Sequence, residues 1–316
     1  MGGRVSEGTQ AIDRVERAVA ETLAGRRVVL AVSGGRDSIA LLHAAARAAR
    51  SSIACVATFD HGTGAAARDA VRLVAAESRS LGLPVTRGRR TGGGDRQTEA
   101  AWRARRLRFL TEVAREHAAQ VATAHTRDDQ LETVVMRVLR AAGARGLAGL
   151  FAESAGFVRP MLAVTRADVT AYVHDMGVPF VDDPFNADTR FLRNRVRRDL
   201  IPALLRRAPQ LDRELLDIAR DAADWRARVD RLALTLSEVR EPGRVGASVV
   251  LSRFEHAALA ILWPAIAARV GLAMDWRGTE RAAAFTTSAT PGKRMQLSGG
   301  WEIRRTREQF ELYLSL

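Results

Sequence analysis

The sequence predicts an α/β protein: a Rossmann-like parallel sheet sandwiched by helices, then a long linker helix and a small α+β C-terminal domain. Two short apolar, β-branched runs, at 27–32 and 53–59, are typical of buried parallel strands. Each is followed by a helical pattern, and this alternation predicts a sheet covered on both faces. The alternation stops after about residue 205, which predicts the second domain.

The N-terminal elements follow from periodicity and turn residues. Ile12, Val15, Val19 and Leu23 recur at spacings of three and four, so a helix opens the chain. We then expect a strand at 27–32, a turn at 33–38, a helix at 39–49, a strand at 53–59, a helix at 66–81, a glycine-rich loop at 88–95, a helix at 98–117, a strand at 121–124 and a helix from about 128.

The sequence predicts fewer helices and strands in the C-terminal part of the chain. We expect domains at 1–212 and 213–316, joined through one long helix at 211–236. The tryptophans of the C-terminal region are interpreted as core or interface packing, since buried indoles are common. After the long helix we expect a loop at 241–246, a helix at 255–270, strands at 295–297, 301–304 and 310–314, and packed tryptophans at 225, 263, 276 and 301.

Composition restricts the class of protein. The 316 residues are 47% hydrophobic and 27% charged, which excludes a disordered chain. The net charge is +13 and Lys293 is the only lysine; a GC-rich genome explains the choice of arginine but not the surplus, which favours a nucleic-acid partner. No apolar run approaches a membrane span or a signal peptide, so we expect a cytoplasmic protein. The single cysteine, Cys55, excludes cysteine-pair chemistry.

The first candidate site is the turn Ser33–Ser38 between the first strand and its helix. Two glycines let backbone N–H groups approach an anion, and the helix N-terminus adds partial positive charge. Asp37 would repel phosphate unless Mg²⁺ lies between them, so we expect Asp37 to bind that metal. The alternative is an ordinary glycine-containing turn, which leaves the two hydroxyls and Asp37 unexplained.

Ser-Gly-Gly-x-Asp-Ser after the first strand resembles the pyrophosphate loop of the N-type ATP pyrophosphatases. The resemblance implies adenylation of an oxygen with release of pyrophosphate. It also implies that the second strand ends near the adenine, at Asp60, whereas His61 is equally open to a turn or an RNA contact. The ATP-binding residues it implies are Ser33, Gly34, Gly35, Arg36, Asp37, Ser38 and Asp60.

The second candidate site begins at His125, at the end of a predicted strand. Asp129 and Glu132 lie three residues apart and share a helix face beside that sheet edge, where open α/β sheets bind ligands. The three side chains could hold an ammonium group, a metal or a proton. The alternative is helix capping, which we favour for Asp128 alone.

The block 125–133 resembles the His-x-x-Asp-Asp-x-x-Glu-Thr signature of the tRNA(Ile)-lysidine synthase family. The resemblance continues in order through residues 25–210 and is weak beyond them. Its further motifs are Met136–Arg140, Gly143–Leu150, Arg159–Leu162, Asp183, Asn186, Arg193–Arg197 and Ile201–Leu204.

The resemblance implies a definite reaction. ATP adenylates the C2 oxygen of cytidine 34 in the CAU anticodon of tRNA(Ile), the ε-amine of L-lysine displaces AMP, and codon recognition switches from AUG to AUA. Asp129 and Glu132 would bind the lysine. ATP and Mg²⁺ would be required, tRNA(Ile) and L-lysine would be the partners, and compact family members suggest a homodimer.

Several arginines complete the predicted site. Arg103 and Arg106 lie on one helical face with Glu99, and with Asp37 and His125 they are our candidate catalytic residues. The family's tyrosine after this pattern is Leu107 here, which removes support for aromatic stacking; a salt-paired surface is the alternative. The candidate contacts to tRNA or to substrate phosphates are Arg193, Asn194, Arg195 and Arg197. A charged first helical turn is an equally favoured interpretation of these residues. In the C-terminal domain, we expect a basic patch that binds tRNA phosphates at Arg294, Arg304, Arg305 and Arg307.

Three other functions are weighed against this one. A tRNA thiolase would need a persulfide cysteine or an iron–sulfur cluster, and the one cysteine lies inside a predicted strand. A glutamine-dependent amidating ligase would need a glutaminase domain, of which the sequence shows no sign. A non-catalytic tRNA-binding scaffold would not need the intact Ser33–Ser38 turn.

Overall fold

The computed structural model describes residues 7–60, 62, 64–89, 99–151, 156–182 and 190–315. Of residues 7, 8 and 99–102 it describes the backbone only. The chain divides into an N-terminal unit, Met1–Arg220, and a C-terminal unit, Asp221–Leu316. Among the expected features, His61, the side chain of Glu99, the glycines at 92–94, Asp183 and Asn186 lie outside the described residues.

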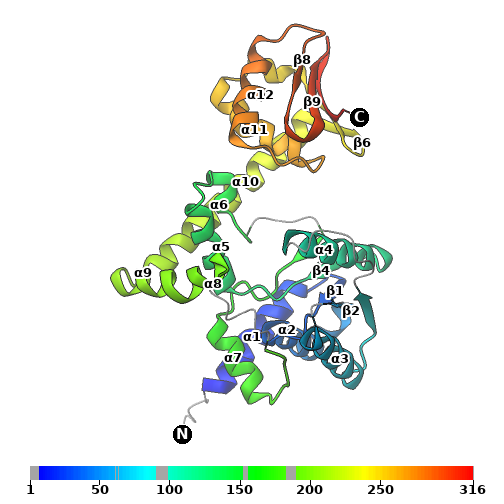
Figure 1. Cartoon of the computed structure of the whole chain (residues 1–316), viewed down its shortest axis with the longest axis vertical. Helices are drawn as coiled ribbons and strands as arrows, with labels where there is room; N and C mark the ends of the chain where they lie inside the picture. The colour runs from blue at the N-terminus through cyan, green and yellow to red at the C-terminus, as the bar shows by residue number, and fades with distance from the viewer. Residues whose placement is uncertain are drawn as a thin grey trace. The chain divides into compact units, whose positions relative to one another are not determined.

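The N-terminal unit contains the predicted parallel sheet. Its strand order is β3-β2-β1-β4-β5, and every neighbouring pair is parallel. Figure 1 labels the central strands β1, β2 and β4 of this sheet. The carboxyl ends of β1, β2 and β4 therefore meet at one edge, where a ligand is expected. The strands are β1 (Val28–Ala31), β2 (Ile53–Asp60), β3 (Val85–Arg89), β4 (Gln120–Ala122) and β5 (Phe157–Val158).

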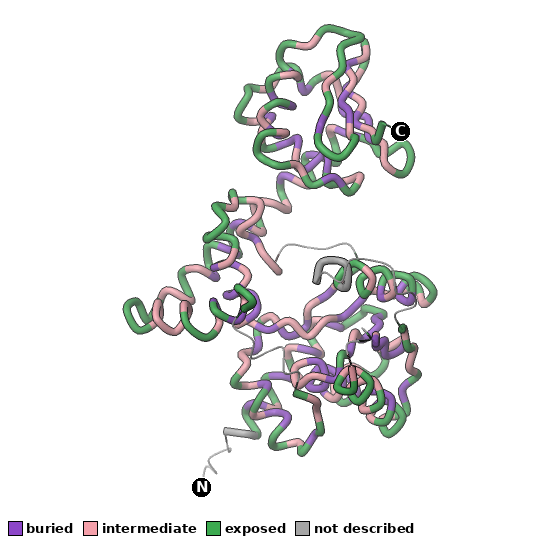
Figure 2. The backbone as a smooth tube through the Cα atoms, viewed as in Figure 1, coloured by how far each residue is buried: buried purple, intermediate pink, exposed green. Residues whose placement is uncertain are grey.

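Helices cover both faces of this sheet, as predicted. Leu30 of β1 belongs to the core formed with α1, α2, α3 and α7, whereas its neighbour Val29 packs with Leu110 and Val113 of α4. Successive strand residues point to opposite faces, and both faces are buried (Figure 2). The helices are α1 (Glu7–Leu23), α2 (Arg36–Ala48), α3 (Ala65–Ser80), α4 (Glu99–Glu116) and α7 (Arg166–Asp175).

A helical layer extends the N-terminal unit beyond the sheet. Leu131 and Val135 of α5 pack against Val196 and against Leu216 at the start of α10. The predicted long helix is confirmed as α10. In the described part of the chain, no helix is both long and apolar enough to cross a membrane. The layer comprises α5 (Arg127–Val138), α6 (Ala144–Leu147), α8 (Leu192–Arg195), the π-helical turn η3 (Val196–Leu200), α9 (Ile201–Arg207) and the start of α10 (Leu211–Leu236), whose residues from Asp221 belong to the C-terminal unit.

The expected loop from residue 88 is wrong at its beginning, because Gly88 and Arg89 belong to strand β3. A Cβ at Gly88 would lie 2.8 Å from the Phe109 ring of α4 and 2.6 Å from Phe59. The glycine is therefore a site of close packing between strand and helix rather than a loop residue.

The C-terminal unit is the predicted small α+β domain. Its antiparallel sheet has the order β6-β7-β10-β9-β8 and packs against α11 and α12 through a core that includes Trp263 and Phe310. The elements are β6 (Ser237–Glu241), β7 (Arg244–Ser248), α11 (His256–Ala268), α12 (Trp276–Ser288), β8 (Arg294–Gln296), β9 (Trp301–Arg305) and β10 (Gln309–Leu314), with short 3-10 turns at Arg50–Ser52, Val249–Arg253 and Ser298–Gly300.

Three C-terminal expectations differ from the structure. Residues 241–246 form a tight turn and a strand rather than a loop, because β7 pairs with both β6 and β10. Helix α12 was not expected. Trp263 is buried as predicted, but Trp276 is 74% exposed, so core packing is wrong for that residue and interface packing stays a prediction.

Candidate active site

The turn after β1 is held in shape by its own hydrogen bonds. The backbone N–H of Ser33 donates to the Ser38 hydroxyl (3.1 Å), and that hydroxyl donates to the Gly35 carbonyl (2.8 Å). Gly34 has φ +88°, and a Cβ there would lie 2.8 Å from the Cβ of Ala70 on α3. Both the backbone angle and the neighbouring helix therefore require glycine. The turn is preorganised before any ligand arrives.

Asp37 lies in the first turn of α2, beside Arg36 (Nε to Oδ1 3.3 Å). Burial is the main cause that raises the pKa of Asp37, and the nearby charge of Asp129 adds to it, against the opposing effect of Arg36 and Arg166. The ionised carboxylate is thus undercompensated. A divalent cation held between Asp37 and phosphate oxygens would supply the missing positive charge.

The described residues contain no group of three or more His, Cys, Asp or Glu side chains able to enclose a metal. Mg²⁺ does not need such a group, because it commonly uses one or two carboxylates together with phosphates and water. The chemistry of Asp37 therefore fits a metal that arrives with a nucleotide.

The second candidate site begins with a helix cap. Thr126 caps α5, and one oxygen of Asp129, Oδ2, accepts hydrogen bonds from the Thr126 backbone N–H and hydroxyl, both at 2.9 Å. The other oxygen, Oδ1, faces the site. Asp128 accepts from the backbone N–H of Arg166 (2.7 Å) and so fixes the start of α7. Capping and a site role coexist in Asp129.

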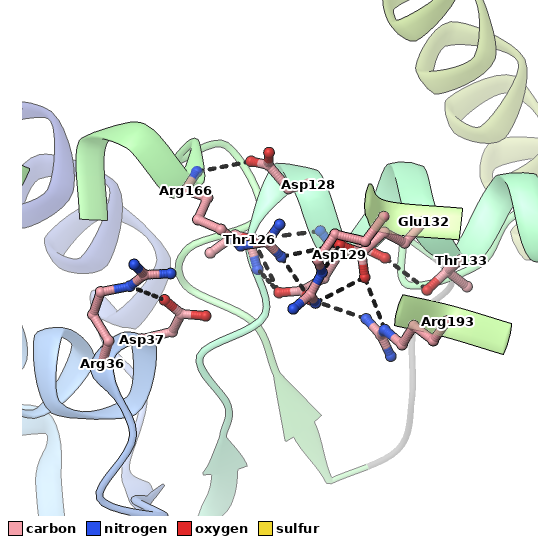
Figure 3. Close-up of polar contacts among 10 residues, drawn as sticks. Arg36, Asp37, Thr126, Asp128, Asp129, Glu132, Thr133, Arg166 and Arg193 are labelled. Atoms are coloured by element: carbon pink, nitrogen blue, oxygen red, sulfur yellow. Dashed lines mark hydrogen bonds and ion pairs between the residues drawn. The ribbon is translucent and has the colours of Figure 1, made fainter. Parts of the chain in front are cut away.

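Asp129 and Glu132 form an ionic cluster with three arginines from two other segments (Figure 3). Glu132 is 1% exposed, so its charge depends on these partners. The contacts to Glu132 are Arg193 Nε–Oε2 2.8 Å, Arg197 Nε–Oε1 2.5 Å, Arg197 Nη2–Oε2 3.0 Å and Arg166 Nη2–Oε1 3.1 Å; those to Asp129 Oδ1 come from Arg193 (2.9 Å), Arg166 (3.4 Å) and Arg197 (3.5 Å).

The cluster stabilises its charges mutually. Although burial opposes ionisation of Asp129, the hydrogen bond from Thr126 and the charges of Arg193 and Arg166 lower its pKa. Burial likewise opposes the charge of Arg197, but the hydrogen bond and charge of Glu132 raise the pKa of the guanidinium. The contacts within the cluster therefore favour the charged forms of Asp129 and Arg197.

His125 sits between this cluster and the sheet edge. Its Nδ1 lies 2.9 Å from the Thr123 hydroxyl. Burial lowers its pKa to about 4, and the charges of Arg159, Arg193 and Arg106 contribute, against the opposing effect of Asp129. The imidazole is therefore neutral at pH 7. Because the charge of Arg106 is one of the causes that lower this pKa, Arg106 lies within electrostatic reach of His125.

The remaining predicted residues take separate places. Asp60 is buried at the end of β2 and accepts from the Gly62 backbone N–H (2.8 Å). Arg103 and Arg106 lie on α4 with much of each side chain exposed. The guanidinium of Arg106 nevertheless lies close enough to other protein atoms for desolvation, and secondly the charge of Arg103, to lower its pKa. Asn194 is buried, whereas Arg195 is exposed on the same short helix.

Arg166 is the site residue that sequence reasoning missed. A signal did exist: an arginine directly after the Thr165 cap opposes the positive end of the helix dipole. Such a residue needs nearby carboxylates, and Asp129 and Glu132 supply them.

Comparison with known proteins agrees with this geometry. The PP-loop domain family matches residues 8–204. A U34-tRNA thiolase, NcsA, from Methanococcus maripaludis, solved with its [4Fe-4S] cluster, superimposes with a TM-score of 0.58 over 68% of this chain and 80% of that one, at 14% identity. At this identity the likeness shows the fold alone. The sheet and the turn after β1 thus define a PP-loop protein.

Sequence relatives narrow the class. A tRNA(Ile)-lysidine synthase of Solibacter usitatus is 33% identical over 305 residues, covering 91% of this chain and 67% of the relative. Those of Methylobacterium nodulans and Salinispora tropica are 40% and 41% identical, covering 77% of this chain and 72% and 74% of their own lengths. The chain belongs to the tRNA(Ile)-lysidine synthase family.

The low pKa of half-buried His125 should make the protein acid-sensitive. Its pKa is about 4 when folded and near 6.5 when unfolded, so below pH 6.5 the unfolded chain takes up the proton first. The contribution is complete above pH 6.5 and is lost as the pH falls toward 4. At pH 5 the loss should be roughly 2 kcal/mol.

Urea denaturation at pH 7.5 and pH 5 measures this loss. His125→Asn should lose that much less stability between the two pH values than wild type does. His174→Asn, on an exposed histidine of α7, is the control and should follow wild type. Equal losses for wild type and His125→Asn would contradict the assignment.

Proposed function

We propose that this chain is a tRNA(Ile)-lysidine synthase that ligates L-lysine to C2 of cytidine 34 in the CAU anticodon of tRNA(Ile), with release of AMP and pyrophosphate. Family membership supports the proposal. The observation that carries it within the structure is the placement of a carboxylate pair, Asp129 and Glu132, beside a preorganised phosphate turn containing Asp37.

The first half-reaction uses the turn Ser33–Ser38. Its glycine backbone and the N-terminus of α2 suit the phosphates of ATP. Mg²⁺, which we propose as cofactor, would neutralise phosphate charge and would be held by Asp37. Arg103 and Arg106, exposed on α4, have guanidinium groups that suit the adenylate phosphate. Neutral His125 adds no charge beside the adenylated base.

The second half-reaction uses Asp129 and Glu132. A lysine ε-ammonium carries three donors, which match the carboxylate oxygens that face the site. The amine must lose a proton before it attacks C2 of the adenylated cytidine. Attack forms the C–N bond, and the C–O bond to the adenylate breaks with departure of AMP. The carboxylates orient the amine toward the reacting carbon.

Sulfur transfer, the activity named for the M. maripaludis thiolase, does not suit this chain. The single cysteine, Cys55, is 1% exposed within β2 and packs against α4. Burial is the main cause that raises the pKa of its thiol, which disfavours the reactive thiolate. Adenylation followed by amine attack needs no cysteine.

Labelled L-lysine incorporation with ATP is the direct test. We expect incorporation into tRNA(Ile) with a CAU anticodon and none into initiator methionine tRNA. Asp37→Ala should reduce the rate at least about a hundredfold, because charge stabilisation at the transferring phosphate is lost. Asp69→Ala, on an exposed acid of α3, should keep the wild-type rate.

Each outcome of that assay decides something. Pyrophosphate release with tRNA(Ile) but no lysine incorporation would keep the ATP chemistry and make lysine the wrong nucleophile. Absence of both would contradict the proposed function.

The C-terminal unit is proposed to help bind the tRNA. Between 276 and 307 seven cationic residues accompany only two acids, Glu280 and Glu302. Both acids have partners: Glu280 pairs with His256 (2.8 Å), and Glu302 accepts from Gln296 (2.5 Å). Arg294 pairs with Glu302 (3.8 Å), yet the seven cations still exceed the two acids by five charges. In the N-terminal unit, exposed Arg195 is proposed to contact tRNA phosphate.

Trp276 suits an unpaired base of the tRNA. It opens α12 and is 74% exposed beside Arg277, in a helical turn that packs near Leu297 at the end of β8. Arg281 of α12 donates to the Gln296 carbonyl (2.8 Å), which ties this helix to the strand carrying Arg294. An exposed indole among arginines is a stacking platform for single-stranded nucleic acid.

Trp276→Ala should weaken tRNA binding about tenfold, with Trp276→Phe intermediate, because base stacking is lost in part or in full. A filter-binding titration measures the dissociation constant. Leu234→Ala, which truncates another exposed apolar side chain of this unit, is the matched control. Unchanged tRNA binding by Trp276→Ala would rule out the platform, and altered self-association would indicate an interface between two copies instead.

We also propose a cytoplasmic location, which the tRNA substrate requires, and a homodimer, which follows from resemblance to compact family members. Sedimentation at several protein concentrations tests the dimer.

A further inference from the structure

The proposed lysine-binding carboxylates are saturated by the protein's own arginines. Three of the four oxygens, Glu132 Oε1, Glu132 Oε2 and Asp129 Oδ1, accept from guanidinium groups at 2.5–3.5 Å. The fourth, Asp129 Oδ2, accepts from the cap residue Thr126. A lysine ammonium would find no vacant acceptor on either carboxylate.

The charge balance of the cluster also opposes lysine. Three guanidinium groups, those of Arg166, Arg193 and Arg197, face two carboxylates, which leaves an excess of one positive charge. An arriving ammonium would add a second positive charge to a site in which Glu132 is almost fully buried. A cation is admitted only if a guanidinium leaves or an anion arrives.

Two of the three arginines have room to leave. The side chains of Arg193 and Arg197 are 37% and 27% exposed and belong to α8 and η3, a segment interrupted by a π-helical turn. Such turns occur often at functional sites. Arg166 is more buried, at 20%, and its backbone N–H is bound by Asp128.

The phosphate turn is the place to which they can move. The charge of Asp37 contributes to raising the pKa of Arg197, so the guanidinium lies within electrostatic reach of the α2 N-terminus. Figure 3 shows Asp37 and Arg36 next to the cluster. ATP would bring several negative charges to that position, and guanidinium groups bind phosphate oxygens in bidentate fashion.

We infer that Arg193 and Arg197 take the place of the lysine ε-ammonium in the free protein, and that ATP draws them onto its phosphates, so that nucleotide binds before lysine. The inference rests on the proposed function and adds the binding order and two positioning residues. Arg166 stays with the carboxylates and keeps Asp129 and Glu132 ionised and aligned.

Calorimetric titration of L-lysine tests this order without chemistry. We expect wild type to bind lysine at least tenfold more tightly with Mg²⁺ and α,β-methylene-ATP present than without nucleotide. By linkage, lysine should tighten nucleotide binding by the same factor. Equal lysine affinity with and without nucleotide would overturn the inference, and this arm needs no variant.

Variants then assign the effect to residues. Arg197→Met should bind lysine without nucleotide more tightly than wild type does, since one competing guanidinium is gone while Arg166 and Arg193 still compensate Glu132. Arg197→Lys, which restores a cation, should return part of the nucleotide dependence. Arg207→Met, on an exposed arginine of α9, should match wild type in lysine affinity. A merely structural Arg197 would lower lysine affinity under both conditions.

The outcomes separate the two proposals. Lysine incorporation into tRNA with nucleotide-independent lysine binding would sink the inference alone. Lysine that neither binds under any condition nor enters tRNA would sink the proposed function.

Discussion

The buried charge of Glu132 is the constraint on which the site depends. A carboxylate that is 1% exposed is costly to ionise unless cations compensate it. Its compensation comes from α7, α8 and η3, while Glu132 itself belongs to α5. One ionic cluster therefore fixes elements that are more than 30 residues apart in the chain. When one of the three arginines moves away, the other two still compensate Glu132, so the cluster can rearrange without leaving this carboxylate unpaired.

The sheet edge concentrates opposing charges that a purely structural design would avoid. Asp37 is undercompensated, the arginine cluster carries an excess positive charge, and half-buried His125 is neutral. In the proposed function, an anionic nucleotide and a cationic amine would complete these arrangements. Strong perturbation of several neighbouring groups is typical of functional sites.

Local patterns predicted much of the fold. β-Branched runs predicted β1 and β2, and the bounds predicted for the long helix, 211–236, agree with those of α10. The predictions were wrong where residue types common in loops lie in strands because of their tertiary contacts. Gly88 resembles a loop residue but lies in β3 because Phe109 must approach closely. The segment at 241–246 contains Pro-Gly, yet β10 pairs with the strand that follows it. In both cases the pairing strand or the packing helix determines whether the segment is a strand or a loop.

The sequence by itself determined the turn Ser33–Ser38 and the cap of α5, because each depends on residues a few positions apart. It placed Asp129 and Glu132 on one helix face through their spacing of three. Only the tertiary structure decided what they face: Arg166, Arg193 and Arg197 converge from segments whose spacing carries no information about distance. Burial of Glu132 and the excess positive charge, which govern what can bind, arise from that convergence. Ionic partners far apart in the chain are set by packing, whereas caps and turns are set by neighbours.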